Sequence, residues 1–171
     1  MREPGVLEEA WEERAGDLFP PAPAEAEALL WRAARSWSDT DRARGWLLLA
    51  DRDYGDLLPV VLGCYKFHFY KGLLREAIPY AEKAARIMGE KLGLPADFFQ
   101  VRPEDADFSG YEAAPRFYLF AMKAVGYLHA RLGETERAVA VLEKILELDR
   151  KDRLAVSRLM AVIERKGGEE E

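Results

Sequence analysis

The stretch Gly133-Glu134-Thr135-Glu136-Arg137-Ala138 decides the fold, because its pattern occurs a second time as Gly72-Leu73-Leu74-Arg75-Glu76-Ala77. Each copy places an alanine five residues after a glycine, between segments whose apolar residues recur every three or four positions. A glycine can end a helix in the left-handed conformation. A small alanine lets the next helix approach the first closely. Both stretches therefore predict a tight turn between two packed helices.

Helical spacing of apolar residues continues along nearly the whole chain, and the alternating pattern of strands is missing. The chain is therefore predicted to be all-α, with about eight short helices arranged as antiparallel hairpins. Turn and cap residues place these helices near 6–18, 23–37, 38–50, 56–71, 74–91, 115–132, 134–148 and 152–166. Residues 51–55 are expected to form a turn, and Asp56 is expected to cap the helix that follows.

Composition limits the classes of protein that are possible. The 171 residues are 49% hydrophobic and 33% charged, which is typical of a globular domain, and the net charge of −6 disfavours nucleic acid as a partner. Cys64 is the only cysteine, so an internal disulfide or a cysteine zinc cluster is excluded. No apolar run approaches the ~20 residues that span a bilayer, and the first residues do not resemble a signal peptide. A cytoplasmic protein without a membrane partner is expected.

The glycine–alanine turns are part of a longer repeat. Ala43 and Ala77 are 34 residues apart, and so are Ala50 and Ala84. This is the period of the tetratricopeptide repeat (TPR), and the chain resembles that family over about 100 residues. The resemblance implies a TPR-like stack, an α-α superhelix, and therefore a single domain over 1–171.

The repeat frames differ in how well they match. Frame 119–152 matches best, with Gly126 where the family has a small residue, and frame 58–91 keeps the turn glycine. Frame 24–57 is degenerate, because Trp31 occupies the small-residue position. The same division leaves an N-terminal helix in 1–22, an insertion at 92–118, and a capping helix with a tail at 153–171.

The resemblance also implies where a partner would bind. In TPR proteins the first helix of each repeat lines a concave groove, and here these helices carry cations and aromatic side chains. The groove residues are Arg32, Arg35, Lys66, Phe69, Tyr70, Lys123, Tyr127 and Arg131. Such a surface suits an acidic or carboxylate-bearing peptide, although ordinary solvated helix residues would give the same pattern. The chain has no asparagine, so it departs from the TPR proteins that clamp a carboxylate with asparagines.

The insertion at 92–118 is a second candidate interaction site. It contains four aromatic residues, Phe98, Phe99, Phe108 and Tyr111. Long connections in compact domains are often functional. The aromatic residues are expected either to fold back over the core or to form a lid or a docking loop for a partner.

Catalytic and metal sites are not predicted. Residues 105–110 resemble the start of an EF-hand calcium loop, but Arg116 occupies the position of the essential glutamate. His68 and His129 fall at family positions for inward aromatic residues, and Cys64 falls at a buried apolar position. All three are therefore expected to be structural. The sequence has no nucleotide-binding, hydrolase or metalloprotease motif, so we expect a protein without catalytic residues, metal or cofactors.

Tryptophans test the predicted core. Trp11, Trp31 and Trp46 lie on apolar stripes and are expected to be buried. The N-terminal helix is expected either to cap the stack or to mediate self-association into a homo-oligomer.

These features favour a non-enzymatic protein-interaction module, such as an adaptor, a scaffold or an assembly chaperone. The size and repeat plan resemble type III secretion chaperones. Residues 58–70 and 116–120 faintly resemble small TPR proteins encoded among nitrogen-fixation genes, which would make nitrogenase or an assembly factor the partner. A helical enzyme or a small-ligand-binding protein is the alternative from another class.

Overall fold

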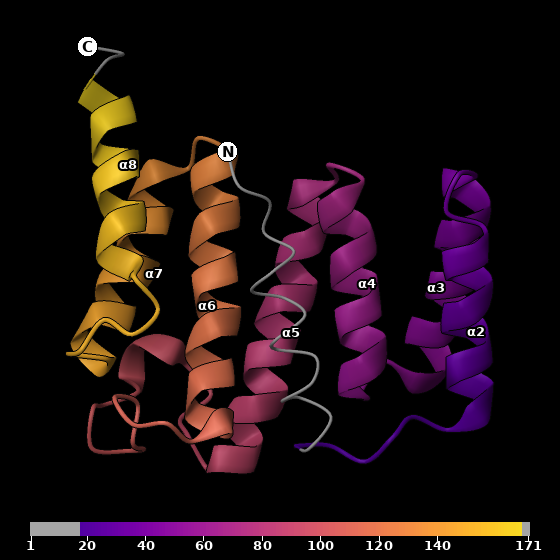
Figure 1. Cartoon of the computed structure of the whole chain (residues 1–171), viewed down its shortest axis with the longest axis horizontal. Coiled ribbons are helices and arrows are strands. Elements are labelled where there is room, and N and C mark those ends of the chain that lie inside the picture. The colour runs from indigo at the N-terminus through magenta and orange to yellow at the C-terminus, as the bar shows by residue number, and fades with distance from the viewer. Residues whose placement is uncertain (1–17, 169–171) are drawn as a thin grey trace. The chain divides into compact units, whose positions relative to one another are not determined.

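The computed structural model describes the backbone of residues 18–168 and the side chains of residues 18–165. Within that part the chain is all-α, as predicted, and contains no strand. The elements, shown in Figure 1, are α2 (Ala24–Arg35), α3 (Thr40–Tyr54), α4 (Leu58–Tyr70), α5 (Leu74–Leu92), the 3₁₀ turn η1 (Phe98–Gln100), α6 (Ala113–Arg131), α7 (Thr135–Leu148) and α8 (Val156–Gly168). The helix predicted at 6–18 lies outside the described residues except for Leu18.

The chain divides into two compact units, residues 1–72 and residues 73–171. The predicted assignment of α4 and α5 to one repeat stays a prediction, because these helices belong to different units.

In the first unit α2 packs on α3, and both contact α4. Asp39 begins α3, since its Oδ1 accepts a hydrogen bond from the Arg42 amide at 3.1 Å, the interaction expected of an N-cap. The core consists of small residues and a few larger apolar ones: Ala26, Ala33, Ala43, Leu47, Ala50, Leu58, Val60, Val61, Cys64 and Phe67. Small side chains on α2 and α3 let the two helices lie close together.

Two predicted boundaries in this unit are wrong. Residues 51–54 continue α3 instead of forming a turn, and the chain turns at residues 55–57, where the Leu57 amide donates to the Tyr54 carbonyl at 3.0 Å. Asp56 does not cap α4, whose N-cap is Leu57 without a side-chain hydrogen bond. Pro59 lies in the first turn of α4, where its fixed φ suits a helix and its missing N–H costs nothing.

Trp31 corrects the predicted core, because its side chain is 66% exposed. At about 100° per residue, Ala26, Leu30 and Ala33 share one face of α2, and Trp31 is turned roughly 140° away from Ala26. Trp46 is half-buried and its ring lies 4.9 Å from the Arg32 guanidinium. Trp11 lies outside the described residues.

In the second unit α6 lies centrally and contacts α5, α7 and α8 (Figure 1). The predicted turn between α6 and α7 is present. Gly133 has a φ of +76°, which favours glycine, and Ala138 five residues later is fully buried. Gly126 of α6 faces Leu142 of α7 so closely that a Cβ on it would lie 2.8 Å from the leucine Cδ2.

α8 begins four residues later than predicted, and Asp152 explains the difference. Its backbone has a φ of +45°, so residue 152 is not helical. Its carboxylate instead accepts hydrogen bonds from the Val156 amide at 2.6 Å and from the Ser157 amide at 3.2 Å. These contacts satisfy the first free N–H groups of α8.

None of the helices among the described residues combines the length and the apolar character needed to cross a bilayer.

A pair of glycine substitutions tests the α6–α7 contact. Gly126→Ala should lower the free energy of unfolding by about 1–3 kcal/mol, because the new methyl group collides with the buried Leu142. Gly45→Ala on α3 is the matched control. No atom would lie within 4 Å of its Cβ, so the higher helix propensity of alanine should stabilise the protein by about 0.5–1 kcal/mol. Urea unfolding followed by circular dichroism measures both, and equal effects would contradict the contact.

Candidate functional site

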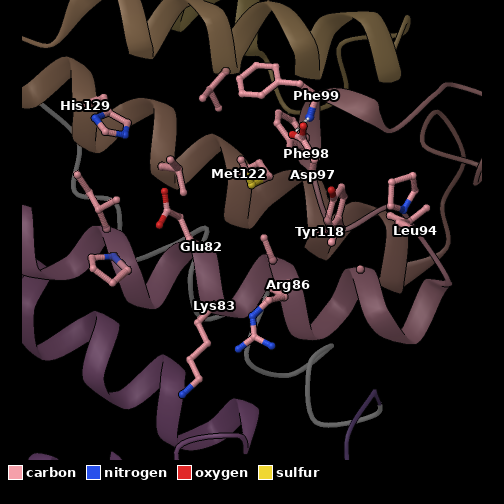
Figure 2. Close-up of a pocket in the computed structure, with 18 of the residues that line it drawn as sticks. Glu82, Lys83, Arg86, Leu94, Asp97, Phe98, Phe99, Tyr118, Met122 and His129 are labelled. Atoms are coloured by element: carbon pink, nitrogen blue, oxygen red, sulfur yellow. Dashed lines mark hydrogen bonds between the residues drawn. The ribbon is translucent and has the colours of Figure 1, made fainter.

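A pocket of about 1070 Å³ lies within the second unit, between α5, α6, α7 and the segment 94–99. Figure 2 shows His129 at one end of it and Leu94, Phe98, Phe99 and Tyr118 at the other. The apolar lining consists of Ile78, Pro79, Ala85, Met122, Val125, Ala140 and Val141 beside these aromatic residues. Charged lining residues are Arg75, Glu82, Lys83, Arg86, Glu90, Asp97 and Arg137. The site is therefore apolar along its base and charged along its sides.

One stripe of α6 builds the base of the pocket. Tyr118, Met122, Val125 and His129 follow the helical spacing and lie on one face of α6. Residues 123, 127 and 131 lie about 180° away on the opposite face. Helix α6 therefore separates the pocket from the surface predicted to bind a partner.

Glu134 links three helices at the His129 end of the pocket. Its carboxylate accepts a hydrogen bond from Arg75 of α5 at 2.8 Å and lies 2.5 Å from His129 Nδ1 of α6. Arg137 of α7 lies 3.9 Å from the same carboxylate. The hydrogen bonds from His129 and then Arg75 hold the pKa of Glu134 below its ordinary value. A single carboxylate thus joins three helices.

Tyr118 forms the other end. Its ring centroid lies 5.9 Å from that of Phe98 and 6.2 Å from that of Phe108. Burial, together with the nearby charge of Asp97, raises the pKa of Tyr118 to about 12, so the phenol stays neutral at physiological pH. Asp97 in turn accepts a hydrogen bond from the Phe99 amide and orders η1.

The four aromatic residues of the insertion differ in whether they cover the core. Phe98 and Phe108 are buried, with Phe108 only 1% exposed, so these two aromatic residues cover the core. Phe99 and Tyr111 are 51% and 79% exposed. Tyr111 nevertheless has a partner, since the Arg153 guanidinium lies 4.0 Å from the centre of its ring.

Hydrogen bonds also fix the second half of the insertion to the α7–α8 connection. Buried Asp149 accepts a hydrogen bond from Ser109 Oγ at 3.1 Å and another from the Arg153 amide at 2.8 Å. Arg153 Nε donates to the Ser109 carbonyl at 2.7 Å. The segment is tied to the unit at several points, which does not suit a freely opening lid.

Five of the predicted groove residues lie in the first unit. Arg32 and Arg35 are exposed on α2, and Tyr70 is exposed at the end of α4. Lys66 and Phe69 of α4 are half-buried. Helices α2 and α4 are in contact, so these side chains belong to neighbouring helices.

The other three predicted groove residues lie in the second unit, on α6. Tyr127 and Arg131 are joined by a hydrogen bond of 2.9 Å, and Arg131 is exposed. Lys123 is half-buried, and its Nζ donates to the Leu154 carbonyl at 2.5 Å. Burial lowers the pKa of Lys123, against the opposing effect of Asp152. Lys123 therefore holds the α7–α8 connection in place.

The two histidines and the cysteine are buried. His68 and His129 are each 8% exposed, and His68 Nδ1 lies 2.7 Å from the Cys64 carbonyl. Cys64 is fully buried and its Sγ lies 3.9 Å from the Leu47 carbonyl. Among residues 18–165, no three His, Cys, Asp or Glu side chains gather into a potential metal site.

The pocket was not predicted from the sequence. Phe98 and Phe99 were singled out, but Ile78, Tyr118 and Met122 were not. The signal available was the run of apolar and aromatic residues along α6, which also fits an ordinary buried stripe. What turns it into a pocket is the position of segment 94–99, and that depends on tertiary packing.

Comparison with known proteins gives one informative relative. A protein of Azotobacter chroococcum mcd 1, described as an uncharacterized 19.8 kDa protein in the nifW 5′ region, is 34% identical over 141 residues. The aligned residues cover 80% of this chain and 77% of that protein. No protein-family model matches the chain, and no solved structure matches it.

Two substitutions in the insertion separate core cover from surface. Phe108→Ala should lower the free energy of unfolding by about 3–5 kcal/mol, because it leaves a cavity against Tyr118. Phe99→Ala, which removes a half-exposed ring, should cost less than about 1.5 kcal/mol. Denaturant unfolding measures the difference, and equal losses would show that the aromatic residues do not divide in this way.

The lowered pKa of Glu134 predicts that the stability of the protein depends on pH. A carboxyl whose pKa is lowered on folding stabilises the protein fully above its unfolded pKa, near 4.5, and loses this effect as the pH falls through the lower folded pKa. Glu134→Gln should therefore destabilise the protein at pH 7, and its difference from wild type should shrink below pH 4.5. Glu136→Gln, on the exposed side of α7, is the control and should have little effect. Thermal unfolding of both variants across this pH range measures the effect. Equal behaviour of the two variants would contradict the stabilising role of the Glu134 carboxylate.

Proposed function

This chain belongs to the family of the uncharacterized 19.8 kDa protein in the nifW 5′ region, and we propose that it is a non-enzymatic protein-interaction module acting in nitrogen fixation. It would serve as an adaptor, scaffold or assembly chaperone, with nitrogenase or one of its assembly factors as the partner. The relative's gene region favours this role over that of a type III secretion chaperone.

We propose further that each unit has TPR-like stacking. In the first unit α2 contacts α3 and α4, and α3 contacts α4. In the second unit α6 contacts α7 and α8, and α7 contacts α8. A first helix that touches both its own second helix and the next first helix is the neighbour pattern of helical-hairpin repeats. The close contact of Gly126 with Leu142, the positive φ of Gly133 and the burial of Ala138 support this proposal.

The observation that carries the proposed binding role is the exposed cluster on α2. Trp31 is 66% exposed, and Arg32 and Arg35 on the same helix are also exposed. Tryptophan, arginine and tyrosine dominate the binding energy of protein interfaces. Tyr70 adds an exposed ring on neighbouring α4. An acidic protein segment would complement the two arginines and Lys66.

Charge reversal tests this surface. The tagged full-length protein, expressed in nitrogen-fixing cells, should co-purify in stoichiometric amount with a nitrogenase component or an assembly factor. Arg35→Glu combined with Lys66→Glu should weaken that binding at least about tenfold, because both changes repel an acidic partner. The purified pair would be measured by calorimetry.

The control is Arg42→Glu combined with Arg52→Glu, which makes the same charge change on the exposed side of α3. It should alter the affinity less than about twofold, apart from weak long-range repulsion. The absence of any stoichiometric partner would refute the proposed function. Equal losses in the two double variants would refute the assignment of the surface.

A further inference from the structure

The pocket of the second unit is a long groove that follows α5. Its α5 lining begins at Arg75 and ends at Glu90. Fifteen steps at about 1.5 Å per residue give a length of about 22 Å. We call it the α5–α6 groove, lined by α5 and by Tyr118, Met122, Val125 and His129 of α6. A site of this length exceeds what a compact small molecule fills.

The two ends of the α5–α6 groove carry opposite charge, with Glu82 and Lys83 between them. Arg75 and Arg137 lie at the end near the start of α5, and both are exposed. Glu90 and Asp97 lie at the opposite end and are also exposed. Arg86 pairs with Glu90 at 3.0 Å, so Asp97 leaves this end with a negative charge. Arg75 and Arg137 share the single carboxylate of Glu134, so this end keeps a positive charge. A ligand that runs along the groove would meet positive charge at one end and negative charge at the other.

We infer that the α5–α6 groove binds an amphipathic helix of about 15 residues from a partner protein, lying antiparallel to α5. Its apolar stripe would contact Ile78, Met122 and Val125. Its last turn, acidic and at the negative end of the helix dipole, would lie over Arg75 and Arg137, and its basic first turn over Glu90 and Asp97. The inference rests on the proposed function, since its ligand is a protein segment.

An extended peptide fits this site less well than a helix. Extended peptides gain affinity by adding a strand to a free sheet edge, and the groove is lined by helices and by the segment 94–99, without a strand. A helix needs only an apolar trough with complementary charge at its sides, which the groove supplies. The surface also differs from the one proposed on α2 and α4, so each can be tested alone.

The test uses two synthetic 15-residue helical peptides and the full-length protein. Both peptides carry leucines at three- and four-residue spacing. One has lysines in the first turn and glutamates in the last, and the other has glutamines at all of these positions. Fluorescence anisotropy should show that the first peptide binds at least about tenfold more tightly, because only its charges complement both ends of the groove.

Substitutions in the protein test whether the first peptide binds in the groove. Ala140→Trp, at an exposed lining position on α7, should obstruct the trough and weaken binding of the first peptide at least about tenfold. Arg137→Glu should weaken it at least about fivefold by repelling the glutamates. Arg158→Glu, at an exposed position of α8 that does not line the groove, is the matched control and should change it less than about twofold. Circular dichroism confirms that each variant is folded.

Several results would overturn the inference. These are no binding of either peptide, equal binding of both, or binding that Ala140→Trp leaves intact. A peptide of residues 1–17 that binds more tightly than the first peptide and is lost with Ala140→Trp would assign the groove to the chain's own N-terminus. A dimer in light scattering that Ala140→Trp dissociates would assign it to a second copy. Peptide binding needs no cellular partner, so its failure is distinct from failure of the co-purification.

Discussion

Close approach between helices at small residues is the constraint on which the rest of the structure depends. Gly126 of α6 leaves room for Leu142 of α7, and Gly63 of α4 leaves room for Leu30 of α2. A Cβ at either glycine would lie within 2.9 Å of the facing leucine. Since α2, α3 and α4 bury mostly alanine, valine and leucine, their contacts depend on short interaxial distances. The same device recurs in both units.

Helix α6 packs against three other helices, and two of its faces make different contacts. The helix contacts α5, α7 and α8, so ten of its residues are buried. One stripe, with Met122 and His129, forms the base of the groove. On the opposite face Lys123 holds the α7–α8 connection through the Leu154 carbonyl. One face of α6 therefore lines the groove, and the opposite face supports the connection to α8.

The fold was predictable where a residue acts locally, and the site was not. The turn at Gly133 was predictable, because a positive φ is cheap for glycine alone. Helix type followed from spacing. Trp31 was predicted to be buried, yet Ala26 and Ala33 form the buried face of α2 and the Trp31 side chain is exposed. The last helix was predicted to begin at residue 152, but the left-handed backbone of Asp152 delays α8 to Val156.

The insertion explains why the groove has a closed end. In a repeat array with a short connection between α5 and α6, the apolar ends of both helices would open to solvent. Here segment 94–99 folds back, and Phe98 packs on Tyr118. Gly89 allows this arrangement, since a Cβ there would lie 3.2 Å from the Tyr118 ring. Asp149 and Arg153 anchor the rest of the insertion to the α7–α8 connection. The insertion between α5 and α6 therefore closes one end of the groove that these helices form.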